Sequence, residues 1–119
     1  FVGFIGFKND RVTAGGEVTY KSNIEPVRGH HAWGVSGTGS LGLTQKTEIF
    51  TRFDFSASVT PPGDITPWNR ENDGNFFIAG FQYSPVENVK FAVDYQGTYP
   101  YAREKIASKA IFLNALFRF

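Results

Sequence analysis

The sequence predicts an all-β chain of antiparallel strands, and three observations point to this fold class. Six segments have an apolar face that repeats with a period of two, which is the side-chain period of a strand, and an apolar segment precedes them at 1–8. Aromatic residues favoured in strands are abundant, with 13 Phe and 5 Tyr, and 13 Gly suit strands that twist and tilt. The connections between the segments alternate between short and long, which indicates an up-and-down arrangement.

The expected strands span residues 1–8, 11–21, 32–43, 48–59, 75–83, 90–99 and 109–119. The clearest alternation lies in 48–59, where Ile49 and Phe53 alternate with Glu48 and Arg52. Asn9 begins a two-residue hairpin signal. Proline and glycine interrupt the pattern in the connections at 22–31 and 60–75. The strands after the first therefore each have one predominantly apolar face, and the opposite face is more polar.

The lengths of the connections indicate where the two ends of the strands lie. The segments at 9–10, 44–47 and 84–89 are short, whereas those at 22–31, 60–75 and 101–108 are longer. Barrels of the bacterial outer membrane have short periplasmic turns and longer extracellular loops. The sequence therefore predicts a transmembrane antiparallel up-and-down β-barrel, with the long loops extracellular and the carboxy terminus periplasmic.

The spacing of aromatic residues agrees with a strand that crosses a membrane. Phe91 and Tyr99 are eight residues apart. At ~3.4 Å per residue and a ~40° tilt, they are ~21 Å apart along the membrane normal, close to the ~25 Å apolar band of such barrels. The candidate lipid-facing or girdle residues are Tyr20, Trp33, Phe53, Phe55, Phe77, Phe81, Tyr83, Phe91, Tyr95, Tyr99, Phe117 and Phe119.

The opposite faces carry charges of both signs in equal number. The candidate lumen-lining residues are Glu17, Lys21, Glu48, Arg52, Asp54, Lys90, Asp94 and Arg118. In a channel, such residues would set the field that an ion meets. Charges in the longest connection, from Asp64 to Asp73, are expected to be solvated, with an inward-folded eyelet or a surface partner as the alternative reading.

Two segments resemble known families. The terminal strand, which ends on Phe117, Arg118 and Phe119, resembles the carboxy-terminal targeting strand of bacterial outer-membrane β-barrels. The hairpin from Gly80 to Tyr95 is similar to the penultimate hairpin of porins, including the phosphate-selective porin family, in which Pro, two residues, Asn-Val and a basic residue follow an aromatic strand end. This resemblance implies a passive diffusion channel, and it does not carry anion selectivity across.

The seven expected strands are an odd number, and this bears on domain organisation. Single-chain bacterial barrels have an even number of strands, and an unpaired edge is not tolerated in lipid. We therefore expect residues 1–119 to be a single barrel segment. It would be the carboxy-terminal part of a longer barrel whose upstream strands and signal peptide are absent from the sequence.

Several other functions are not favoured. The net charge of +1 lacks the excess of basic residues that is typical of proteins that bind nucleic acid. His30 and His31 are adjacent in a long connection, and no Gly-x-Ser-x-Gly segment accompanies them, so we expect no enzyme, no catalytic residue and no cofactor. A metal site from His30, His31 and Glu25 is disfavoured because adjacent residues of an extended chain point apart.

The sequence thus favours a porin-like channel for small hydrophilic solutes or ions. Two alternatives remain, a structural or assembly barrel of an envelope complex and a soluble β-sandwich or lipocalin-like binder. For the membrane readings, the expected partners are membrane lipids and the lipopolysaccharide leaflet. A homo-oligomer and an envelope complex both stay open.

Overall fold

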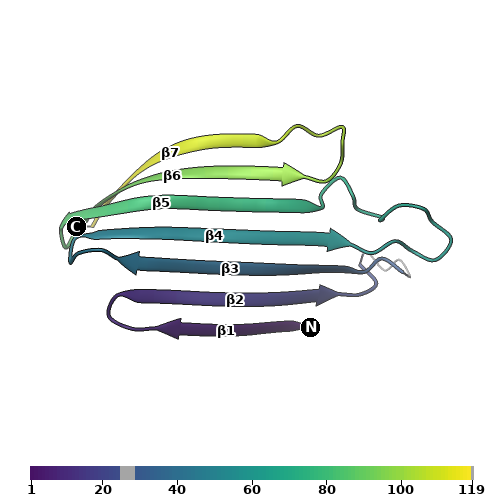
Figure 1. The fold of residues 1–119 in the computed structure, drawn as a ribbon, viewed down its shortest axis with the longest axis horizontal. Coiled ribbons are helices and arrows are strands. Elements are labelled where there is room, and N and C mark those ends of the chain that lie inside the picture. The colour runs from purple at the N-terminus through teal and green to yellow at the C-terminus, as the bar shows by residue number, and fades with distance from the viewer. Residues whose placement is uncertain (25–28, 119) are drawn as a thin grey trace.

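The computed structural model describes residues 1–24 and 29–118. They form one sheet of seven strands in the order β1 to β7, each antiparallel to its neighbours (Figure 1). The strands are β1 (Val2–Lys8), β2 (Val12–Lys21), β3 (Ala32–Gly42), β4 (Thr47–Ser58), β5 (Gly74–Val86), β6 (Val89–Pro100) and β7 (Ser108–Phe117). The predicted all-β, up-and-down arrangement is therefore confirmed. The described residues contain no helix of the length and apolar character that a membrane crossing needs.

The sheet is open. β1 pairs with β2 and β7 pairs with β6, and the two outer strands do not pair with each other. The short connections lie together at the left of Figure 1, which we call the turn end, and the longer ones lie at the right, which we call the loop end. The predicted separation of short and long connections is thus present in the fold.

One predicted connection is wrong in its extent. Residues 84–89 were expected to lie outside strands, but β5 continues to Val86 and β6 begins at Val89. The register shifts between Tyr83 and Val86, which marks a bulge at Pro85. The pairing of β5 with β4 ends at Thr47 and Tyr83, so the ladder needs no donor from the proline. Ser84 and Pro85 are typical of turns, so the sequence pattern ended the strand before them, whereas the strand continues through a bulge.

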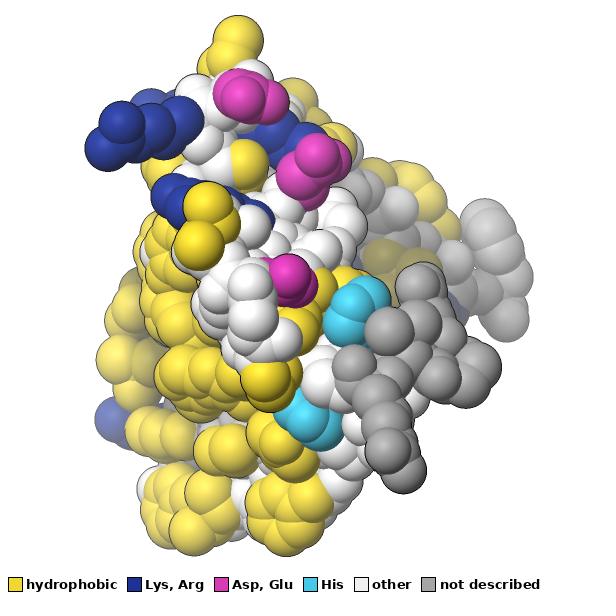
Figure 2. Space-filling model, turned by 90° about the vertical axis from the view of Figure 1, so that its right-hand side faces the viewer, with side chains coloured by type: hydrophobic (Ala, Val, Ile, Leu, Met, Phe, Trp, Pro, Cys, Tyr) yellow, Lys and Arg dark blue, Asp and Glu magenta, His cyan; other side chains and the backbone are white. Residues whose placement is uncertain are grey.

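The register divides the sheet into two faces, because residues paired across antiparallel strands point to the same side. We call the apolar face the side with the odd-numbered residues of β1, β3, β4, β5 up to Tyr83, β6 and β7 and the even-numbered residues of β2. The other side is the polar face. Viewed from the loop end, hydrophobic side chains gather along one side of the molecule (Figure 2).

The molecule is a single layer without a hydrophobic core. No hydrophobic side chain is buried within the described residues, and Phe53 and Val93 in the middle of the apolar face are 46% and 41% exposed. The radius of gyration is 18.1 Å, whereas a compact domain of this length has roughly 13–14 Å. The apolar face therefore has no protein layer against it.

Two glycines give a matched test of how tightly the sheet packs. A Cβ at Gly80 would lie 2.8 Å from the Asp94 Cβ and 2.8 Å from the Val93 carbonyl oxygen, and it would also meet the Phe50 ring. A Cβ at Gly37 would meet nothing within 4 Å. We expect Gly80→Ala to lower the free energy of unfolding by about 1–3 kcal/mol through overpacking. Gly37→Ala should be neutral or stabilising by up to ~1 kcal/mol. Urea midpoints of the two variants would measure this, and equal midpoints would contradict it.

Candidate functional site

The polar face carries most of the charges of the strands. Seven of the eight predicted lumen residues lie on it, and Arg118 follows β7, where its amide donates to the Asn88 carbonyl at 3.0 Å. The seven are Glu17, Lys21, Glu48, Arg52, Asp54, Lys90 and Asp94. The structure thus places them on one side of the sheet but spreads them from the loop end to the turn end.

Asp54 is the centre of a polar cluster on β3 and β4. The Nε of Arg52 donates to both of its carboxylate oxygens, at 2.8 and 3.1 Å, and the Ser36 hydroxyl donates to the same carboxylate. Glu17 lies opposite Ser36 on β2 and accepts a hydrogen bond from the Thr19 hydroxyl at 2.9 Å. The Arg52 side chain is 54% exposed, so the pair is open to solvent on this face. The cluster therefore consists of the ion pair of Arg52 and Asp54, whose charges cancel, and the nearby carboxylate of Glu17.

Asp94 is held by amides rather than by a cation. It is 5% exposed and accepts hydrogen bonds from the side chains of Gln96 and Asn114, both at 2.8 Å. Phe112 lies opposite it on β7. A carboxylate that is buried on the polar face needs such donors, because an unpaired buried charge is costly. Asp94 therefore ties β6 to β7 more than it offers a charge to solvent.

The turn end of the polar face is rich in lysine. An open cavity of about 380 Å³ there is lined by Lys8, Lys46 and Lys90 together with Glu48. Lys8 ends β1, Lys46 lies in the connection before β4, and Lys90 is the second residue of β6. The cations therefore come from separate parts of the chain, and only the sheet brings them to one end.

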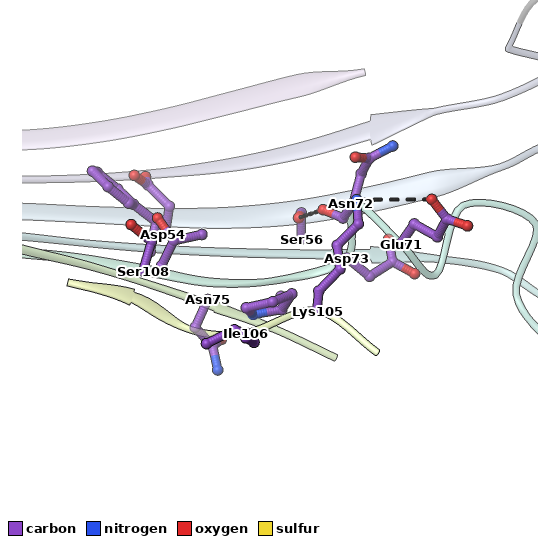
Figure 3. A pocket seen from close by; sticks show the side chains of 13 residues that line it. Asp54, Ser56, Glu71, Asn72, Asp73, Asn75, Lys105, Ile106 and Ser108 are labelled. Atoms are coloured by element: carbon purple, nitrogen blue, oxygen red, sulfur yellow. Dashed lines mark hydrogen bonds and ion pairs between the residues drawn. The ribbon is translucent and has the colours of Figure 1, made fainter. Parts of the chain in front are cut away.

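A second open cavity, of about 430 Å³, lies at the loop end (Figure 3). Asp54 and Ser56 of β4 line it with Glu71, which comes from the connection before β5, and Lys105, which comes from the connection before β7. The Lys105 Nζ lies 3.8 Å from a Glu71 carboxylate oxygen. Two long connections thus meet at this end of the polar face.

Asp73 contradicts the expectation that the charges of the longest connection are solvated. It is 5% exposed and accepts hydrogen bonds from both the backbone amide and the hydroxyl of Ser58, which ends β4. The Asn69 amide donates to the Ser58 hydroxyl at 3.1 Å, and the Trp68 Nε1 donates to the His31 carbonyl at 2.8 Å. The connection is folded back onto the sheet, which charge alone did not reveal.

Removing this carboxylate tests the anchor. In Asp73→Ala, the Ser58 amide and hydroxyl lose their acceptor, and a buried donor without a partner costs ~1–3 kcal/mol. We expect limited trypsin digestion to cleave after Arg70 at least several times faster than in the wild type. Asp64→Ala, in the same connection but exposed, is the control and should digest at the wild-type rate. Equal cleavage in the two variants would contradict the role of Asp73.

Eleven of the twelve predicted lipid-facing or girdle residues are described, and the pattern of faces puts all eleven on the apolar face; Phe119 lies outside the described residues. Tyr20 pairs with Trp33 near the loop end. The Trp33 and Phe55 ring centroids are 4.7 Å apart. Near the turn end, Phe91 and Phe117 make an edge contact at 6.1 Å. Aromatic rings therefore gather near both ends of the apolar face.

The sequence pattern missed Tyr101, Phe76 and Ile78. The Tyr101 ring lies 6.0 Å from that of Phe55 and extends the aromatic group at the loop end, although it follows the last residue of β6. Phe76 and Ile78 lie on the polar face, opposite Asp54 and Arg52. The alternation in β5 could have revealed this pair, because both neighbours of Phe77 in it are apolar.

The two histidines do not converge. The His30 ring stacks on Trp68 with centroids 4.5 Å apart, and the His31 ring stacks on Tyr20 at 6.1 Å. Glu25 lies outside the described residues. Among residues 1–24 and 29–118, no group of three or more His, Cys, Asp or Glu residues could hold a metal ion. The histidines thus take part in aromatic contacts at the loop end.

The fold defines an all-β, single-layer, up-and-down sheet with one apolar and one polar face. No protein-family model, no curated protein and no solved structure matches the chain. The function therefore has to be argued from the two faces and the two ends of the sheet.

Proposed function

We propose that this chain forms part of the wall of a transmembrane β-barrel in the bacterial outer membrane, and that the barrel is a porin-like channel for passive diffusion of small hydrophilic solutes or ions. The observation that carries the proposal is the apolar face, which spans seven strands, is exposed, and has no protein layer against it. Lipid is the solvent that such a face needs, and water suits the opposite face.

The ends of the sheet support this orientation. Aromatic rings of the apolar face gather near the loop end and near the turn end, as in the two interfacial girdles of membrane barrels. The three longer connections lie together at one end, which we assign to the extracellular side. The short connections would then face the periplasm.

The two open edges support a larger barrel. β1 and β7 run in the same direction, because they are the first and last of seven strands that alternate in direction. Closure by antiparallel pairing therefore requires an odd number of further strands between them. Both edge strands are strongly apolar, with Ile5 78% and Leu113 84% exposed, and such an edge needs a partner in lipid. We propose that additional strands complete the wall.

A second candidate function rests on a separate observation. Phe76, Ile78 and Phe112 lie on the polar face, and Phe112 is 44% exposed. An apolar patch on the inner wall would suit a plug or another envelope protein better than water. The alternative is therefore a plugged or structural barrel rather than an open channel.

Planar-bilayer recording separates these functions. The full-length polypeptide, refolded and inserted into a bilayer, should give steady ohmic current steps if it is an open channel. Insertion without current would overturn the channel and favour the plugged or structural barrel. A monomer that stays in water without detergent would overturn both, and would favour a soluble sheet whose apolar face is covered in another way.

A further inference from the structure

Lys109 is exceptional among the charged residues of the strands. The pattern of paired residues puts every other charged side chain of β1 to β7 on the polar face, whereas Lys109 lies opposite Gly97 on the apolar face. It is the second residue of β7, close to the loop end. A lysine is costly in the middle of a bilayer and cheap near its interface. Under the proposed function, Lys109 lies where a cation is tolerated.

The ring of Tyr99 on β6 lies beside this lysine, and its hydroxyl is bonded to that of Tyr95. The Lys109 Nζ lies 5.8 Å from the centroid of the Tyr99 ring. The hydroxyls of Tyr99 and Tyr95 are 2.7 Å apart and hydrogen bonded. The ring of Tyr99 lies over Gly97, where a Cβ would be only 2.7 Å from the ring atom Cε2. Glycine at this position therefore leaves room for the Tyr99 ring.

In the part of the chain that the structure describes, no ion pair neutralises the charge of Lys109. The ion pairs of the described residues join Arg52 to Asp54 and Lys105 to Glu71, and neither includes Lys109. The strands carry no carboxylate on the apolar face. A lysine could simply extend its chain toward water. The hydrogen-bonded hydroxyl pair leaves one hydrogen free to donate to an anion, and under the proposed function the anion at this depth belongs to a lipid headgroup.

We propose that Lys109, with the hydroxyls of Tyr95 and Tyr99, binds the phosphate of an anionic lipid headgroup in the leaflet at the loop end. Lys109 supplies the charge, and the one hydroxyl hydrogen that is not used between the two tyrosines donates to a phosphate oxygen. This inference rests on the proposed function, because it needs the apolar face to touch lipid.

Native mass spectrometry of the full-length protein in mixed micelles tests this site. The probe lipids are phosphatidylglycerol, which is anionic, and phosphatidylcholine, which has no net charge. We expect the wild type to retain phosphatidylglycerol in preference, and Lys109→Gln to reduce that preference about fivefold, since one lysine near a membrane surface contributes that factor. Lys109→Arg should keep the preference, and Tyr99→Phe should weaken it.

Lys90→Gln is the matched control, because Lys90 lies on the polar face of the neighbouring strand. An equal loss of phosphatidylglycerol in Lys90→Gln would show a general charge effect and overturn the site. An unchanged preference in Lys109→Gln would also overturn it, as would competition by inorganic phosphate at equal concentration. Insertion of the same variants into lipid vesicles is measured in a parallel experiment. Failure to insert would contradict the proposed function, whereas insertion without a preference for phosphatidylglycerol would contradict only the proposed lipid site.

Discussion

Replacing Val93 with lysine is expected to destabilise the sheet in a bilayer by about 2–4 kcal/mol, whereas replacing its neighbour Ala92 with lysine is not. Val93 lies on the apolar face between Phe81 and Leu113 and is 41% exposed. A lysine on the lipid side of a barrel wall costs about 2–4 kcal/mol near the bilayer midplane. This is a large share of the 5–15 kcal/mol that typically stabilises a domain.

Ala92 provides a control that differs only in the face it occupies. It lies on the polar face of the same strand, between Gln82 and Asn114, where a lysine can stay hydrated. Urea titration of both variants in lipid vesicles would give the two free energies of unfolding. Equal values would contradict the assignment of the apolar face to lipid.

Spin labels give an independent reading of the same two positions. The chain contains no cysteine, so Val93→Cys and Ala92→Cys each offer a single labelling site. A label at position 93 should be reached by oxygen, which concentrates in the bilayer, and a label at position 92 by a water-soluble nickel complex. A label at position 93 that neither reagent reaches would indicate burial in protein.

The strands and the division into faces could be predicted because both depend on local alternation. Arg52 to Val59 alternate strictly, and a period of two leaves one arrangement of faces once the segment is a strand. The alternation of short and long connections was also visible, since proline and glycine mark them in the sequence. These features need no knowledge of distant residues.

Features that depend on pairing between distant residues could not be predicted. From the sequence, Asp73 is expected to be a solvated charge in a loop. It holds the loop to the sheet only because Ser58, fifteen positions earlier, lies close enough to donate to it. The cluster on Asp54 required Ser36 on the neighbouring strand, which the register supplies. The alternation of β7 was read for its apolar residues, so the cation at Lys109 was overlooked.

Reversing the charge of Arg52 is expected to shift the ion preference of the proposed channel. Arg52→Glu makes the net charge of the polar face more negative by two, next to Asp54. Glu17 lies on the same face, because it pairs with Ser36, which in turn pairs with Asp54. For a monovalent ion that passes ~8 Å away in water, the electrostatic energy changes by ~1 kcal/mol before screening. Screening at physiological ionic strength reduces this change to about 0.4 kcal/mol. Cations gain and anions lose this amount, so the ratio of cation to anion permeability should rise about fourfold.

The reversal potential in a potassium chloride gradient measures this ratio directly. Arg103→Glu is the control, because it makes the same change of charge in the exposed connection before β7 rather than on the strand face. It should move the reversal potential much less, since screening removes most of the effect of a distant exposed charge. A shift of equal size in both variants would mean that the polar face does not line the ion path, because only a residue on that path acts at short range.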